Sequence, residues 1–142
     1  MPKKNAKSKR ADAERAAEWY AHEISDCVVT CRAVRTQWQS QDLFASDVIG
    51  KRADGSMVFI QATAGQYSAV TARRRKLEKI PWQENDSVGV LQLIQTEDPA
   101  NSRRKLWFFR VHKLFPSGNW ETSHEAVPVP KQWFTAYKNR GK

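Results

Sequence analysis

Two polar side chains, Asp47 and Gln61, lie within apolar segments that an Asp-Gly pair joins. The first segment covers residues 42–50, the second covers residues 57–63, and the Asp-Gly pair is at 54–55. Both segments have the composition of β-strands, and an Asp-Gly pair favours a tight hairpin turn. A hairpin closed at this turn brings the Asp47 carboxylate near the Gln61 amide. Carboxylate and carbonyl oxygens are the ligands that Mg²⁺ prefers, so the spacing predicts a divalent-metal site.

Further oxygen atoms are available to complete such a site. Asp47 is the strongest ligand, and the main-chain carbonyl of Ala62 is a candidate next to it. Glu14 lies on the first predicted helix and reaches the site if that helix packs across the hairpin, with Glu18 as its substitute one turn later. Asp42 is a reserve acidic ligand. We therefore expect Mg²⁺, or Mn²⁺ in its place, to be held by Asp47, Gln61 and Glu14.

Each of these residues also has a purely structural interpretation. Asp47 could cap the end of a strand or pair with Arg52, and Gln61 and Thr63 could satisfy the edge of a sheet. Glu14 could lie on a solvated helix face, as exposed helical glutamates usually do. The metal-site hypothesis requires instead that these side chains converge.

The order of segments predicts an α/β domain in which helices flank a central mixed sheet. The run at 88–94 is almost continuously apolar, which is typical of a central strand covered on both faces. The predicted helices are 13–24 with Asp12 as N-cap, 68–80 ended by Pro81, and 131–138; the predicted strands are 27–34, the two hairpin strands, 88–94, 106–115 and a short strand at Trp120. We expect residues 1–10 to form a flexible basic tail and residues 11–142 a single domain, with a core at about 11–95 and a hairpin and helix extension at 96–142.

The charge of the chain favours a polyanionic partner. The 142 residues carry a formal net charge of +9, and the sequence pI is about 9.8. No apolar run approaches the roughly 20 residues that span a bilayer, and no signal-peptide core is present, which predicts a soluble cytoplasmic protein. A basic surface can serve solubility alone, but phosphate contacts explain three separate clusters better. The cations expected to contact nucleic acid are Lys9, Arg10, Lys51, Arg73, Arg74, Arg75 and Lys76, with a further cluster at 103–105; Trp38 could stack on an unpaired base.

Residues 9–95 resemble the PD-(D/E)XK nuclease superfamily, which has a restriction-endonuclease-like fold, and in particular the archaeal-type Holliday-junction resolvases and small phage endonucleases. In that family a helix with Glu in an Ala-Glu-Arg setting precedes a strand, and residues 13–15 are similar. An Asp on the next strand holds metal there, and Asp47 matches it. The third motif is normally Glu-x-Lys, whereas this chain has Gln61-Ala62-Thr63. Small phage-like members are similar in carrying Gln-x-Thr before an Arg/Lys-rich helix.

The resemblance implies a metal-dependent DNA endonuclease that hydrolyses phosphodiester bonds, selects branched or junction DNA, and acts as a homodimer. It implies catalytic roles for Glu14, Asp47, Gln61 and Thr63. Gln in place of Glu removes a negative charge from the metal site, and Thr in place of Lys removes a cation that stabilises the transition state. Two alternatives therefore remain: a nuclease-fold protein that binds or inhibits without cutting, and an accessory protein that binds a nucleic-acid enzyme through its aromatic final third.

Overall fold

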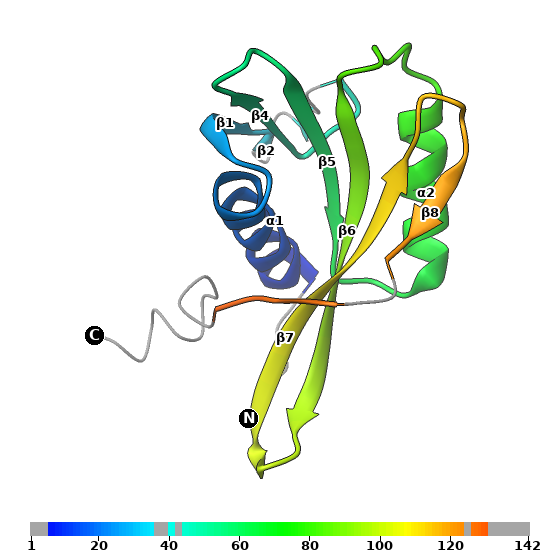
Figure 1. Ribbon diagram of the computed structural model, residues 1–142. Helices are drawn as coiled ribbons and strands as arrows, with labels where there is room; N and C mark the ends of the chain where they lie inside the picture. Colours follow the sequence, from blue (N-terminus) through cyan, green and yellow to red (C-terminus); the bar gives the residue numbers. More distant parts are fainter. Residues whose placement is uncertain (1–5, 36–39, 42–43, 124–125, 131–142) are drawn as a thin grey trace.

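The computed structural model describes residues 6–35, 40–41, 44–123 and 126–130 (Figure 1). The predicted closing helix at 131–138, Trp38 and Asp42 lie outside this range. The elements in chain order are α1 (Ala6–Glu23), β1 (Cys27–Arg32), β2 (Val34–Arg35), β3 (Ser40–Gln41), β4 (Val48–Arg52), β5 (Met57–Thr63), α2 (Tyr67–Glu78), β6 (Ser87–Asp98), β7 (Asn101–Leu114), β8 (Trp120–Thr122) and β9 (Val127–Pro128).

A curled mixed sheet forms the centre of the fold. Its strand order is β1-β4-β5-β6-β7-β8, with β9 paired to β7, while β2 and β3 pair separately. Strands β5 and β6 are parallel, and the other pairs are antiparallel. The connection between the parallel strands is α2, as expected because parallel neighbours need a crossover. The predicted mixed α/β architecture is confirmed at this level.

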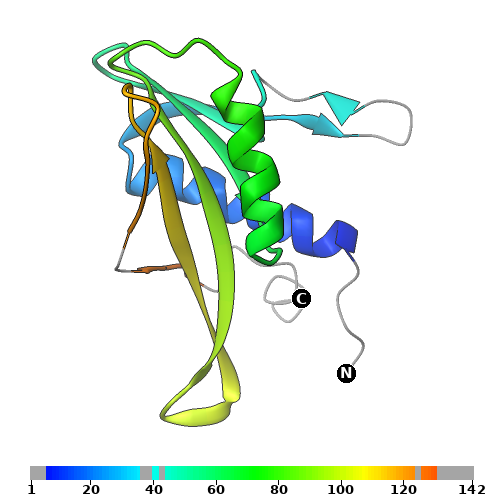
Figure 2. The ribbon, with the colours of Figure 1, turned by 90° about the vertical axis from the view of Figure 1, so that its right-hand side faces the viewer.

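The two helices cover opposite faces of the sheet (Figures 1 and 2). Helix α1 presents small residues to one face, where Ala13, Ala16, Ala17 and Ala21 are fully buried against a cluster that includes Ile60 and Leu91. Alanine also has the highest helix propensity, so the same residues favour both the helix and its close approach. Tyr20 adds an edge-to-face contact with Phe109, with ring centroids 6.1 Å apart.

Helix α2 covers the other face with larger side chains. Val70 and Leu77 are fully buried against a cluster of Phe59, Val88 and Val90. Burying one side chain of the size of Leu77 contributes roughly 2–3 kcal/mol. The apolar residues of β6 alternate between the two clusters, since Val88 and Val90 face α2 whereas Leu91 faces α1. This two-sided burial confirms the prediction of a central strand.

The hairpin turn predicted at 54–55 is present, and a second tight turn joins β7 to β8. Gly55 has a φ of 89°, and its N–H donates to the Arg52 carbonyl at 3.0 Å. Gly118 has a φ of 90°, and its N–H donates to the Phe115 carbonyl at 2.8 Å. Positive φ costs glycine little, which is why these positions could be recognised from sequence.

Several predicted boundaries are wrong. Strands β6 and β7 include residues 95–98 and 101–105, which were expected to lie outside strands. Helix α1 begins at Ala6 and not at Ala13, so Asp12 lies inside the helix as a buried residue and does not cap it. Residues 6–10 of the expected flexible tail are therefore helical. Strand β4 begins at Val48, so Asp47 immediately precedes the strand. None of the described helices is long and apolar enough to cross a membrane.

Candidate active site

The β4–β5 hairpin places Asp47 beside the end of β5, as its spacing predicts. The β4–β5 ladder begins with the pair of Val48 and Ile60, and Asp47 immediately precedes this pair. The Asp47 N–H donates to the Ile60 carbonyl at 2.8 Å, and Asp47 Oδ2 accepts the N–H of Ala62 at 2.8 Å. The Asp47 carboxylate thus accepts a hydrogen bond from the β5 backbone just before the start of β4, in the way that a strand carbonyl would. Asp47 is only 2% exposed, which makes it a buried carboxylate at a strand end.

Gln61 fixes the turn that presents Asp47. Its Nε2 donates to the carbonyl of Ala45, and its side chain is 2% exposed. Phe44 and Ala45 have left-handed backbones, with φ of 50° and 58°. Such conformations cost a non-glycine residue roughly 1–2 kcal/mol each. The hydrogen bond from the buried Gln61 amide to the Ala45 carbonyl compensates part of this strain. With its nitrogen engaged, Gln61 has its amide oxygen as the one side-chain atom suited to a cation.

Thr63 and Arg73 complete the polar end of β5. The Thr63 hydroxyl accepts the N–H of Gly65 at 2.9 Å, and Arg73 Nε donates to the Ala62 carbonyl at 3.1 Å. A Cβ at Gly65 would lie 2.8 Å from the Cβ of Ala69, so only glycine allows α2 to start this close to β5. The guanidinium of Arg73 therefore lies beside the Gln-x-Thr segment, on a neighbouring element.

Glu14 is buried, contrary to its structural interpretation as a solvated helix residue. It is 8% exposed and belongs to α1, which packs on the sheet face opposite to α2. Ile60 and Ala62 contact the α1 cluster, so by strand alternation Gln61 and Thr63 face α2. Within the described ranges, no three His, Cys, Asp or Glu side chains are arranged to hold a metal ion.

Two alternatives considered from the sequence are not observed. Glu18, the expected substitute for Glu14, accepts a hydrogen bond from Thr30 at 2.9 Å and pairs with Arg32 at 3.6 Å, so it is engaged at β1. Arg52 donates to the carbonyl of Ser25 at 2.7 Å and to the hydroxyls of Ser56 and Ser87, so its guanidinium is engaged away from Asp47.

No protein-family model, curated protein or solved structure matches this chain. The function proposed below therefore rests on the residues and their geometry.

A buried polar network under α2 was missed by the sequence reasoning. Arg74 Nη2 lies 2.8 Å from His112 Nδ1 and 2.9 Å from Thr122 Oγ1. His112 Nε2 lies 3.1 Å from Gln92 Oε1, and Gln92 Nε2 donates to the Gly65 carbonyl at 3.3 Å. Because arginine only donates, His112 Nδ1 must accept, which makes Nε2 the protonated nitrogen of a neutral ring. The signal in the sequence was the same as for Asp47: a polar residue inside an apolar strand.

This network ties α2 to the sheet at two points, near its start through Gly65 and in its middle through Arg74. Arg73, which reaches the strand end, is the neighbour of Arg74 on the same helix. Burial lowers the pKa of His112 most, and the positive charges of Arg74 and Arg110 lower it further, to about 4. The ring is therefore neutral near pH 7. Gln92, His112 and Arg74 thus hold α2, the helix that carries Arg73, against the sheet.

The basic residues expected at a nucleic-acid surface divide into four groups, and Arg73 beside the end of β5 is one of them. Arg74 is turned inward and stacks over Trp120, with its Cζ 5.0 Å from the ring centroid, so it is not part of the outward cluster. Arg75, Lys76 and Lys51 are exposed. Lys9 and Arg10 lie on α1, but their side chains and all of Trp38 lie outside the described part of the chain.

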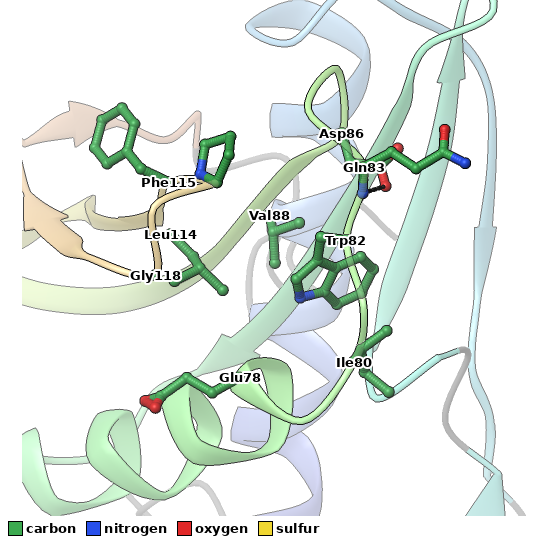
Figure 3. A pocket seen from close by; sticks show the side chains of 10 residues that line it. Glu78, Ile80, Trp82, Gln83, Asp86, Val88, Leu114, Phe115 and Gly118 are labelled. Atoms are coloured by element: carbon green, nitrogen blue, oxygen red, sulfur yellow. Dashed lines mark hydrogen bonds between the residues drawn. The ribbon is translucent and has the colours of Figure 1, made fainter.

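A pocket of about 320 Å³ lies at the other end of the sheet, between the C-terminal end of α2 and the β7–β8 turn (Figure 3). Its carboxylates come from Glu78 and Asp86. Glu78 accepts a hydrogen bond from Trp120 Nε1 at 3.3 Å, and Asp86 accepts one from the Gln83 N–H at 2.9 Å. Two carboxylates and an apolar lining around Trp82 and Val88 disfavour a phosphate here, so this pocket is not part of the candidate site.

Proposed function

We propose that this chain is a metal-dependent DNA endonuclease with a restriction-endonuclease-like core. The order of elements supports this proposal: α1, a strand, a strand preceded by Asp47, a strand ending in Gln61-Ala62-Thr63, α2, and a parallel strand. The observation that carries the proposal is the buried group of Asp47, Gln61 and Thr63 at one end of β5, with Arg73 beside it. A basic protein with a net charge of +9 has a clear electrostatic reason to bring DNA to this group.

The oxygen atoms at this site are a small set of donors that suits Mg²⁺. Mg²⁺ is commonly bound by one or two carboxylates together with substrate phosphates and water. Asp47 supplies the carboxylate, and the amide oxygen of Gln61 and the carbonyl of Ala62 are neutral donors. Glu14 belongs to the helix on the opposite face of the sheet, so Asp47 is the one acidic donor proposed here. When bound, Mg²⁺ or Mn²⁺ would polarise the scissile phosphate and lower the pKa of a water molecule.

The residues of the chain would then have separate tasks. Asp47 holds negative charge at the strand end, and Gln61 fixes the turn from which Asp47 projects. The third motif of the resembling family has lysine at the position where this chain has Thr63. Arg73 supplies a guanidinium next to this segment in place of the lysine. A cation there stabilises the charge that develops on a phosphate oxygen during hydrolysis. The exposed cations Arg75, Lys76 and Lys51 would contact the DNA backbone.

The direct test is a metal titration with defined DNA substrates. Supercoiled plasmid, linear duplex and a four-way junction should each be incubated with the purified chain in EDTA, Mg²⁺ or Mn²⁺. We expect cleavage only with metal and fastest on the junction. Absence of cleavage of every substrate in both metals, from a protein that still binds DNA, would refute the hydrolytic function.

One observation favours a second candidate, a DNA-binding protein of the same fold without hydrolysis. Asp47 Oδ2 and the Ala62 carbonyl, both expected to contact metal, are already hydrogen-bonded to the Ala62 N–H and to Arg73. If these bonds persist with DNA bound, the site holds no cation. Binding that is equal with and without metal, and never followed by cutting, is the result that this candidate predicts.

Arg73 provides a test of the proposed charge compensation. We expect Arg73→Ala to lower the single-turnover cleavage rate about 10–100-fold at saturating protein, because a transition-state contact is lost. Arg75→Ala, an exposed neighbour on α2, is the matched control and should weaken DNA affinity without changing the saturated rate. Equal effects of both substitutions on the saturated rate would contradict a specific role for Arg73.

Symmetric cleavage of a junction requires two sites, so we further propose that the active form is a homodimer. Sedimentation velocity of the free protein and of its complex with a four-way junction measures this directly. A complex with one copy per junction that cuts both strands would contradict it.

A further inference from the structure

The β6–β7 hairpin extends well beyond the rest of the sheet as a two-stranded ribbon (Figures 1 and 2). Pairing of β5 with β6 ends at Thr63 and Gln92, and the β9 segment reaches β7 only as far as Trp107. Within the described part of the chain, residues 95–106, called the arm here, therefore have no further strand on either side. Two-stranded ribbons are marginal in water unless something else contacts them, which makes the arm a candidate contact surface.

The tip of the arm is ordered by its own polar side chains. Asp98 Oδ1 accepts the N–H of Ala100 at 2.9 Å, and Asn101 Oδ1 accepts the N–H of Arg103 at 3.0 Å. Glu97 and Lys105 form an ion pair at 3.5 Å across the ribbon. One carboxylate of the arm thus caps the tip turn and the other pairs with Lys105.

Arg103 and Arg104 remain as exposed cations of the tip. They lie where the ladder shifts register between Glu97 and Asp98. Bulges of this kind re-aim side chains, and consecutive extended residues project toward different sides of a strand. Positive charge on more than one side of a narrow ribbon suits a partner that surrounds the ribbon with anions, as the two phosphate-lined walls of a groove do.

The dimensions of the arm fit the major groove of B-form DNA. Strand residues advance about 3.3 Å each, so the arm reaches roughly 15–20 Å beyond its last neighbouring strand. The B-DNA major groove is about 12 Å wide and 8.5 Å deep and admits a two-stranded ribbon, whereas the A-form RNA major groove is too narrow. An acidic protein surface would contact one side of the ribbon only.

We infer that the arm is a major-groove contact for B-form duplex DNA. Because β6 runs parallel to β5, the arm leaves the sheet at the end where β5 stops at Thr63, so a duplex held by the arm passes the candidate active site. The inference shares its DNA partner with the proposed function, but it does not depend on hydrolysis.

Charge reversal at the tip tests the inference. R103E/R104E is compared with K79E/K113E, which makes the same change of charge at exposed positions away from the arm. Fluorescence anisotropy with a fluorescent duplex in EDTA measures affinity over a range of KCl concentrations. At about 100 mM salt we expect R103E/R104E to weaken binding roughly 10–100-fold and to lower the slope of log K against log salt by about 2, with the control within about threefold.

Two further measurements identify the groove and remove the tip. Dimethyl sulfate footprinting of guanine N7, an atom of the major groove, should show protection that R103E/R104E loses. A variant in which Asn-Gly replaces residues 97–105 closes the ribbon at the Thr96 and Leu106 pair and should bind like R103E/R104E. Its thermal unfolding should remain cooperative.

The inference is overturned if both double variants bind alike, if N7 protection is absent, or if an RNA duplex of the same sequence binds as tightly as the DNA. Failure of the proposed function looks different, because a wild-type protein that binds through the arm but never cuts in Mg²⁺ or Mn²⁺ refutes hydrolysis alone.

Discussion

Asparagine in place of Asp47 is expected to lower the metal-dependent cleavage rate by about 10³-fold while DNA affinity in EDTA stays within about twofold. The substitution removes the negative charge and keeps an oxygen that can accept the Ala62 N–H, now 2.8 Å from Oδ2. Alanine would instead leave that buried N–H unpaired, at a cost of about 1–3 kcal/mol, and would mix a folding defect with a catalytic one. The measurement is single-turnover nicking in Mg²⁺ and in Mn²⁺.

Asp54→Asn is the matched control, since it makes the same chemical change on the same hairpin. Asp54 is exposed, and hydrogen bonds from Ser56 lower the pKa of its carboxyl. We expect this variant to cleave at the wild-type rate. Wild-type cleavage by Asp47→Asn, or equal losses in both variants, would place the chemistry away from the end of β5.

Local sequence signals predicted those parts of the fold that local chemistry determines. The turns at Gly55 and Gly118 require positive φ, and glycine marks them. The apolar run of β6 identified a strand buried on both faces. The left-handed pair at Phe44 and Ala45 carries no such mark, because neither residue is glycine and the conformation is held by Gln61 from another strand.

The start of α1 shows how local signals can mislead. Asp12 before an alanine-rich segment has the chemistry of an N-cap, yet it lies within the helix. Residues before it are themselves compatible with a helix, and burial of the alanine face against the sheet favours one continuous element. Local capping preference is worth about 1 kcal/mol, which tertiary packing exceeds.

Arg73 to Lys76 were all expected to contact nucleic acid, which requires that the four cations face outward together. The partner that turns Arg74 inward, His112, is 38 residues away in the chain. Only the pairing of β6 with β7 brings Gln92 and His112 under α2. A polar residue within an apolar strand was sufficient to select Asp47 as a candidate, and the same criterion applied to Gln92 and His112 would have indicated this network.

The free energy of unfolding is expected to fall by about 2 kcal/mol between pH 7 and pH 5 because of the protonation of His112 alone. The pKa of His112 is about 4 in the folded protein and near 6.5 in the unfolded chain. Between these values the unfolded state binds more protons than the folded state, so stability decreases as pH falls below about 6.5 and levels off below about 4. Urea unfolding at fixed temperature and several pH values measures the effect.

His112→Gln isolates this contribution, because a neutral amide cannot take up the proton and keeps a donor and an acceptor at this position. The variant should be less stable than the wild type at pH 7 but should lose little further stability by pH 5. Protonation of His112 would put an N–H against the guanidinium of Arg74 at a distance of 2.8 Å and would release the middle of α2 from the sheet. Since α2 carries Arg73, cleavage should decline more steeply over this pH range in the wild type than in His112→Gln, where only the loss of metal-bound hydroxide remains. Parallel pH profiles of the two proteins would show that the network does not position the helix.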